Sequence, residues 1–146
     1  MKKTWVLVAH RGGARVFENK GPGTGLSLLQ DIPHPDGRLR SKDLGTDEPG
    51  RSHDSHGARH SFQQEVGLAA HVAEAFARQL AGILDEGRVG QRYGRLVLVA
   101  EAHFLGILRA ALSREASALV TASLNKDLGH VKTDEMPKHL HDVLQL

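Results

Sequence analysis

The chain has 146 residues, of which 40% are hydrophobic and 25% charged, and its formal net charge is +2. This length and composition predict one globular domain over residues 1–146 and exclude a chain that is disordered throughout. Cysteine is absent, which excludes disulfides, thiolate catalysis and cysteine-ligated metal clusters.

The first part of the chain predicts three strands. Residues 4–9 are apolar on both faces, as in a central strand that is covered on both sides. A glycine turn at 10–13 leads to a second strand over 14–19, and the turn cluster 20–25 leads to a third over 26–32. We therefore expect an antiparallel meander with the first strand in the middle of the sheet.

The regular pattern stops in the segment 34–61. It is rich in proline, glycine and histidine, and its acidic and basic residues are nearly balanced. A stretch of this length without a pattern inside a compact domain is usually functional or disordered. We predict a long, polar, flexible loop here.

Helices and strands alternate after this loop. Ser61–Gln64 has the spacing of a capping box and predicts the start of a long amphipathic helix that ends near Gly87. The later pattern predicts a strand over 95–100, a helix over 101–114, a strand over 117–124 and a short helix over 133–144. The order β-β-β-loop-α-β-α-β-α predicts an α/β fold, a single-domain mixed sheet that starts antiparallel and continues by crossovers.

The first ten residues look briefly like a signal peptide, but two features argue against one. The apolar run, residues 5–9, is too short, and His10 and Arg11 follow at once. No segment contains the roughly 18 apolar residues that a membrane helix needs. We predict a cytoplasmic protein without a membrane contact.

Histidines in the predicted loop raise the question of a metal site. His53, Asp54, His56 and His60 offer three imidazoles and a carboxylate, ligand types that suit zinc. The spacing does not match HExxH, and a segment with few apolar anchors holds ligands poorly. A solvated loop is the favoured interpretation and a metal site the alternative, so we expect no cofactor.

No residue set predicts catalysis clearly. Ser52 and Ser55 each precede a histidine, but side chains of neighbouring residues seldom converge, and a GxSxG elbow is absent. We assign no catalytic residue.

Two turns carry polar residues of interest. His10 and Arg11 end the first strand, where α/β sheets often bind ligands, although a plain hairpin turn is the favoured interpretation. Arg15 projects from the second strand, where an edge charge would discourage aggregation. Lys126–Leu128 follow the last strand and predict either a turn held by the aspartate side chain, which we favour, or part of a surface patch.

Several short motifs together resemble the bacterial host-attachment protein family over nearly the whole chain. They are Trp5–Ala9 with Ala14–Arg15, Pro49–Ser52, Phe76–Ala77, Leu105–Arg109 and Lys126–Leu128. That family is named for a requirement in attachment to host cells. It looks like a branch of the bacterial relatives of archaeal and eukaryotic peptide-chain release factors and corresponds to their middle domain, so the resemblance implies an α/β fold akin to that domain.

The resemblance also implies a role for the segment 34–61. In release factors the equivalent connection carries a Gly-Gly-Gln tip that enters the peptidyl-transferase centre. This chain has no Gly-Gly-Gln, and its Gly12–Gly13 pair lies in another turn and precedes an alanine. We do not expect peptide release by that mechanism, but Arg51 and Arg59 can contact phosphates through their guanidinium groups.

The leading hypothesis is a non-catalytic factor that binds the ribosome or tRNA through the 34–61 loop and acts on attachment indirectly. With 4% aromatic residues, contact through phosphates is favoured over base stacking, and we expect no DNA partner. The alternatives are a hydrolase of RNA or an ester that uses loop histidines, and a protein-interaction module without RNA. The candidate RNA-contacting residues are Arg11, Arg15, Arg51, Arg59, His60 and Lys126.

Overall fold

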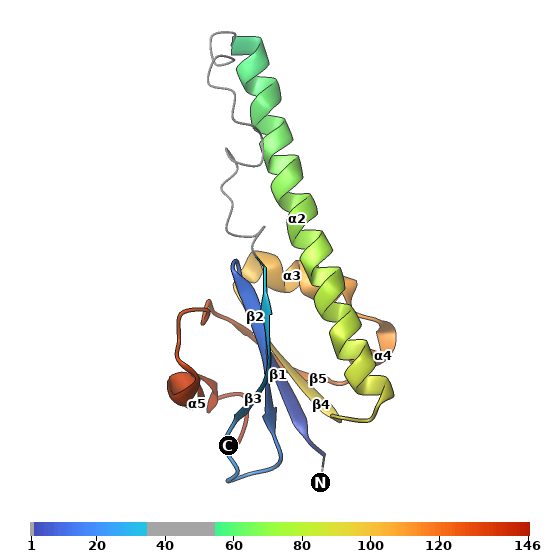
Figure 1. Ribbon diagram of the computed structural model, residues 1–146, viewed down its shortest axis with the longest axis vertical. Coiled ribbons are helices and arrows are strands. Elements are labelled where there is room, and N and C mark those ends of the chain that lie inside the picture. The colour runs from blue at the N-terminus through green and yellow to red at the C-terminus, as the bar shows by residue number, and fades with distance from the viewer. Residues whose placement is uncertain (1, 35–54) are drawn as a thin grey trace.

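The computed structural model describes the backbone over residues 2–34 and 55–146 and the side chains over 2–34 and 67–146. The strands are β1 (Thr4–His10), β2 (Gly13–Asn19), β3 (Ser27–Pro33), β4 (Arg95–Ala100) and β5 (Val120–Asn125). In this part of the chain they form one mixed sheet in the order β3-β2-β1-β4-β5 (Figure 1). β1 and β2 pair antiparallel, as do β2 and β3, whereas β1 with β4 and β4 with β5 pair parallel.

Helices cover both faces of this sheet. They are α2 (Ser55–Val89), α3 (Ala102–Ala111), α4 (Arg114–Ala118), the short 3-10 helix η3 (Thr133–Glu135) and α5 (Met136–Leu140). Figure 1 shows α2, α3 and α4 on one face and the segment with α5 on the other. The structure thus confirms the predicted α/β fold, in which an antiparallel meander continues through parallel crossovers.

The central position of β1 agrees with its apolar sequence. Leu7 faces the core that α2 and α3 cover, where it packs in one cluster with Leu80. Val6 and Val8 point to the opposite face and pack in a cluster with Met136 of α5. Because successive strand residues point to opposite faces, a strand covered on both sides has no polar position in its middle.

The long helix begins earlier than predicted. α2 starts at Ser55, so residues 55–61 are helical and not the end of a loop, and Ser61–Gln64 lies inside the helix instead of capping it. Once a helix is nucleated, each further residue adds a backbone hydrogen bond, and residues 55–61 contain no proline that would stop this extension. The rest of the predicted loop, 35–54, lies outside the described residues.

Two predicted helices are shorter than expected. The helix predicted over 101–114 ends at Ala111, because Ser113 caps a separate helix, α4, by accepting a hydrogen bond from Ala116 N–H at 3.0 Å. The last predicted helix is divided into η3 and α5, with Pro137 in the first turn of α5, where its missing N–H has no helical partner to lose.

Candidate functional site

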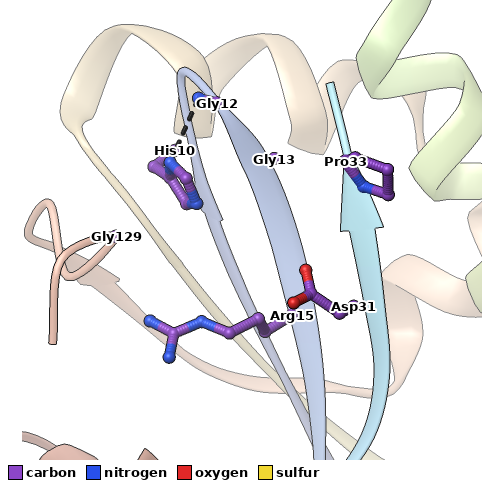
Figure 2. A pocket seen from close by; sticks show the side chains of 7 residues that line it. All are labelled: His10, Gly12, Gly13, Arg15, Asp31, Pro33 and Gly129. Atoms are coloured by element: carbon purple, nitrogen blue, oxygen red, sulfur yellow. Dashed lines mark hydrogen bonds between the residues drawn. The ribbon is translucent and has the colours of Figure 1, made fainter. Parts of the chain in front are cut away.

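A cavity of about 600 Å³ opens beside the carboxyl end of β1. Four separate parts of the chain contribute to it: the end of β1 with the turn to β2, the start of β2, the end of β3, and the loop after β5 (Figure 2). The lining residues are His10, Gly12, Gly13, Arg15, Asp31, Pro33 and Gly129.

Strand register brings two opposite charges to this cavity. Arg15 of β2 and Asp31 of β3 are direct partners in the antiparallel pairing of these strands. Directly opposite residues of an antiparallel pair point to the same face, so both side chains stand on the face that α5 covers further along. Figure 2 shows the Arg15 side chain extending toward the Gly129 loop and the Asp31 carboxylate standing apart from the guanidinium group.

Two contacts fix the position of the Arg15 guanidinium group. Arg15 Nη2 donates a hydrogen bond to the carbonyl oxygen of Leu128 at 3.0 Å. Its Cζ lies 5.5 Å from the centroid of the Phe17 ring, within the range of a cation–π interaction. These two contacts hold the half-buried side chain in place.

One interpretation of Arg15 from the sequence, a charge on an edge strand, is wrong. β2 is an interior strand, because β3 pairs with it on the outer side. The guanidinium group also reaches across the sheet face to the loop after β5 instead of pointing into solvent at an edge.

The loop after β5 is a turn held by an aspartate side chain, as predicted. Asp127 Oδ1 accepts a hydrogen bond from Gly129 N–H at 3.0 Å. The carbonyl oxygen of Leu128, the middle residue of this turn, accepts the hydrogen bond from Arg15. The Leu128 side chain is buried in the core under α5, which anchors the loop.

Close backbone approach shapes the other walls. A Cβ at position 129 would lie 2.6 Å from His10 Cβ, and a Cβ at position 13 would lie 2.5 Å from the Ile32 carbonyl oxygen. Gly13 also has φ +155°, a conformation that L side chains rarely adopt. Both positions therefore need glycine for the elements around the cavity to come this close.

His10 is oriented by the turn that follows it. Its Nδ1 accepts a hydrogen bond from Gly12 N–H at 3.1 Å, which places the proton of the neutral ring on Nε2. Residues 10–13 form a hairpin turn, as the favoured interpretation predicted, and His10 in addition lines the cavity.

The predicted site residues are distributed over several places. Of the candidate RNA-contacting residues, Arg15 lines the cavity, whereas Arg11 and Lys126 are exposed on the turns after β1 and β5. Three predicted residues lie outside the described part of the chain: Arg51, His53 and Asp54. Three others lie on α2, with side chains outside the described residues: His56, Arg59 and His60.

No metal site is present among the side chains that the structure describes, since no group of three histidine, aspartate or glutamate residues lies close enough to hold an ion. The ligand set predicted around His53 and His60 lies outside those side chains, and it stays a prediction.

Sequence patterns did not indicate Asp31 or Gly129 as site residues. One signal was available for Asp31, because it is the only charged residue of the strand SLLQDIP. Its place beside Arg15 depends on the register between β2 and β3, which shifts between Val16 and Phe17. That irregularity has no local sequence signature.

A second feature is the projection of α2 beyond the sheet. Where side chains are described, the buried residues of α2 begin at Phe76. The preceding turns extend past the sheet (Figure 1), and Leu68 on this part of the helix is 43% exposed. The 21 residues from 55 to 75 correspond to roughly 30 Å of helix.

The base of this projection is joined to the turn after β1. His34 N–H donates to the Gly12 carbonyl oxygen at 3.0 Å. The His34 ring stacks on Phe76 of α2, with ring centroids 3.9 Å apart and planes 2° from parallel. The exposed Arg11 and the projecting half of α2 therefore lie at the same end of the molecule.

Comparison with known proteins identifies a family and shows a likeness in fold. A family model described as "Protein required for attachment to host cells" matches residues 5–140. A solved structure named "Archaeal protein" is 8% identical and superposes with a TM-score of 0.51 over 98% of this chain and 35% of its own. Our chain thus spans about a third of the length of that protein, and the likeness shows the fold alone.

No curated protein matches the chain. Among the described helices, none is long and apolar enough to cross a membrane. The likeness to the release-factor middle domain stays a prediction from the sequence.

Proposed function

The chain belongs to the family of proteins required for attachment to host cells, and from this premise we propose that it is a non-catalytic cytoplasmic factor that associates with the ribosome or tRNA. Its part in attachment is then indirect, through translation. The resemblance to release-factor middle domains, which comes from the sequence, supports a partner of this kind.

The observation that carries the proposal is the projecting half of α2. It extends beyond the sheet (Figure 1), and it begins within a part of the sequence that is rich in arginine and histidine. Residues 51–60 contain two arginines and three histidines against one aspartate. A helix that presents cations away from the body of a protein can reach phosphate groups in a groove that the body cannot enter.

Exposed Arg11 adds one positive charge near the base of α2. Arg11 lies on the turn after β1, which is joined to α2 through His34 and Phe76. Because aromatic residues are scarce, the expected contacts are with phosphates and helical shape instead of stacked bases. Binding of this kind weakens as salt rises. Protein side chains displace counterions from the RNA, and the release of these ions is less favourable when the solution already contains much salt.

Co-sedimentation with ribosomes over a salt series tests the proposal. The wild-type protein is compared with the double variant Arg51→Ala, Arg59→Ala and with a control, Arg78→Ala, Arg114→Ala. Arg78 and Arg114 are exposed on the packed half of α2 and on α4, so the control removes the same charge from elsewhere.

We expect wild type and control to pellet at low salt and the test variant to stay in solution. If residual binding of the test variant is measurable, the logarithm of its binding constant should fall less steeply with the logarithm of the salt concentration. The slope should differ by roughly 1.5 for two lost phosphate contacts. An equal loss of pelleting in the control would show that binding depends on total charge and not on Arg51 and Arg59. If wild type neither pelleted with ribosomes at any salt nor bound tRNA, the proposal would be refuted.

A further inference from the structure

We infer that the cavity beside the carboxyl end of β1 binds a small molecule that carries a phosphate or carboxylate group together with a hydroxyl or amine donor. Arg15 would hold the anionic group and Asp31 would accept from the donor. This inference does not depend on the proposed contact of α2 with the ribosome or tRNA, because the described residues that line the cavity include none from α2.

Size and position suit such a ligand. The volume of about 600 Å³ lies within the range of roughly 300–1,000 Å³ that small-molecule sites occupy. The cavity is beside the end of β1, the strand at which pairing changes from antiparallel with β2 to parallel with β4. In α/β sheets, ligands bind outside the carboxyl ends of strands where the arrangement changes.

The Arg15 guanidinium group is ready to receive an anion. It has five N–H donors, of which the structure uses one toward Leu128. Among the side chains that the structure describes, no carboxylate is within ion-pair distance of it, so its charge is not neutralised locally. A half-buried guanidinium group held by Leu128 and Phe17 can bind a phosphate or carboxylate through two parallel hydrogen bonds without first losing its own freedom.

The Asp31 carboxylate requires that the ligand also carry a hydrogen-bond donor. It is the direct strand partner of Arg15, yet the guanidinium group turns toward Leu128 and leaves the exposed carboxylate separate (Figure 2). A ligand with an anion alone would meet repulsion from Asp31. A ligand with a hydroxyl or amine near its anion would satisfy both groups, so the pair selects bifunctional molecules over simple anions.

The lining also limits the size and type of the ligand. Apart from the His10 imidazole, the lining residues that the structure describes offer no aromatic ring on which a nucleobase could stack. Phe17 is fully buried beneath Arg15. The favoured ligands are therefore compact hydroxylated or aminated anions, of which sugar phosphates and free amino acids are the two obvious sources.

Titration of the full chain, followed by amide NMR shifts and calorimetry at low salt, tests the inference. The probes are ribose 5-phosphate and glycine as bifunctional molecules, with inorganic phosphate, ribose and acetate as matched halves. We expect ribose 5-phosphate to bind ten-fold or more tightly than inorganic phosphate or ribose, or glycine to do so relative to acetate. The bound probe should shift the amides of Gly12, Gly13 and Gly129.

Asp31→Asn supplies the decisive variant because it is exposed and nearly isosteric, so the fold should persist. It should weaken the bifunctional probe several-fold and strengthen inorganic phosphate, two changes of opposite sign that a structural defect would not produce. Asp134→Asn, an exposed carboxylate on η3, is the matched control and should change neither. Arg15→Gln should abolish both interactions.

Three results would overturn the inference. One is binding of none of these probes in the millimolar range. Another is inorganic phosphate binding as tightly as ribose 5-phosphate while glycine does not bind. The third is a bound probe whose affinity is unchanged in both Arg15→Gln and Asp31→Asn.

Discussion

Gly129 and His10 lie against each other in the wall of the candidate cavity. They are so close that a Cβ on residue 129 would lie 2.6 Å from His10 Cβ. The two residues are far apart in the sequence and meet because the loop after β5 folds back over the end of β1. The Asp127 side chain holds this loop through Gly129 N–H, and Arg15 holds the adjacent Leu128 carbonyl group.

Gly129→Ala should therefore disturb the cavity. The new methyl group must displace either the His10 ring or the loop, and overpacking of this kind lowers the free energy of unfolding by about 1–3 kcal/mol. Chemical denaturation gives the value, and NMR shifts at Gly12 report whether the Nδ1 hydrogen bond is lost. Gly106→Ala on α3, where nothing lies within 4 Å of the added atom, is the control and should be neutral or stabilising. An unchanged stability of Gly129→Ala would contradict the close contact.

A matched pair of glycines on α2 gives a second prediction. In a helix, glycine to alanine normally stabilises by about 0.5–1 kcal/mol, and Gly82→Ala should do so because its Cβ meets nothing within 4 Å. At Gly87 the Cβ would lie 2.6 Å from the Trp5 ring, which is buried and stacks on Tyr93. Gly87→Ala should destabilise and change the fluorescence of this single tryptophan. The same sign for both variants would show that the Trp5 ring can move aside.

Tyr93 should titrate at unusually high pH. Its hydroxyl group donates to the Leu84 carbonyl oxygen at 2.6 Å, and burial, with Asp85 nearby, raises its pKa to about 12. Because the folded pKa is raised, the stabilisation is complete below the ordinary pKa of 10.0 and is lost as pH rises through about 12.

The phenolate absorbance of this single tyrosine measures the folded pKa directly. Tyr93→Phe keeps the ring and should remove the loss of stability between these pH values. A midpoint near 10 in the folded protein would contradict the burial of the hydroxyl group.

The contact between α2 and α4 should weaken in acid. Ser113 Oγ donates to Asp85 Oδ1 at 2.7 Å, and this hydrogen bond, followed by Arg88, lowers the pKa of Asp85 against the opposing effect of burial. Because the folded pKa is depressed, the stabilisation is present above the usual value of 3.8 and is lost as pH falls through the folded pKa. The melting temperature of Asp85→Asn should depend less on pH in this window than that of wild type, and equal pH profiles would contradict the coupling.

The contribution of the His34–Phe76 ring stack to stability can be measured separately from that of the His34 ring nitrogen Nδ1. Within the described residues, the buried Nδ1 of His34 has no hydrogen-bond partner, which is unfavourable. His34→Phe keeps the ring contact and removes that atom, so it should be neutral or stabilising, whereas His34→Ala should lose about 1 kcal/mol in the free energy of unfolding. Thermal unfolding of both variants decides this, and equal losses would show that the stack contributes nothing.

Local patterns were sufficient for much of the fold. The apolar runs of β1 and β4 predicted buried strands, because residues that are covered on both faces must all be apolar. The motif Lys126–Leu128 predicted a turn held by its aspartate, since that hydrogen bond spans two residues. The start of α2 was missed, because helix extension depends on the stability of the whole helix and a capping motif reports only a local preference.

The sequence by itself therefore determined the α/β class, the central place of β1 and the family likeness, because short-range periodicity and local turn chemistry carry that information. Only the tertiary structure decided that Arg15 would be the strand partner of Asp31 and reach Leu128 across 113 positions of the chain. The register between strands and the return of the last loop are set by the packing of the whole core. No local pattern of residues encodes such long-range contacts, and the candidate cavity depends on them.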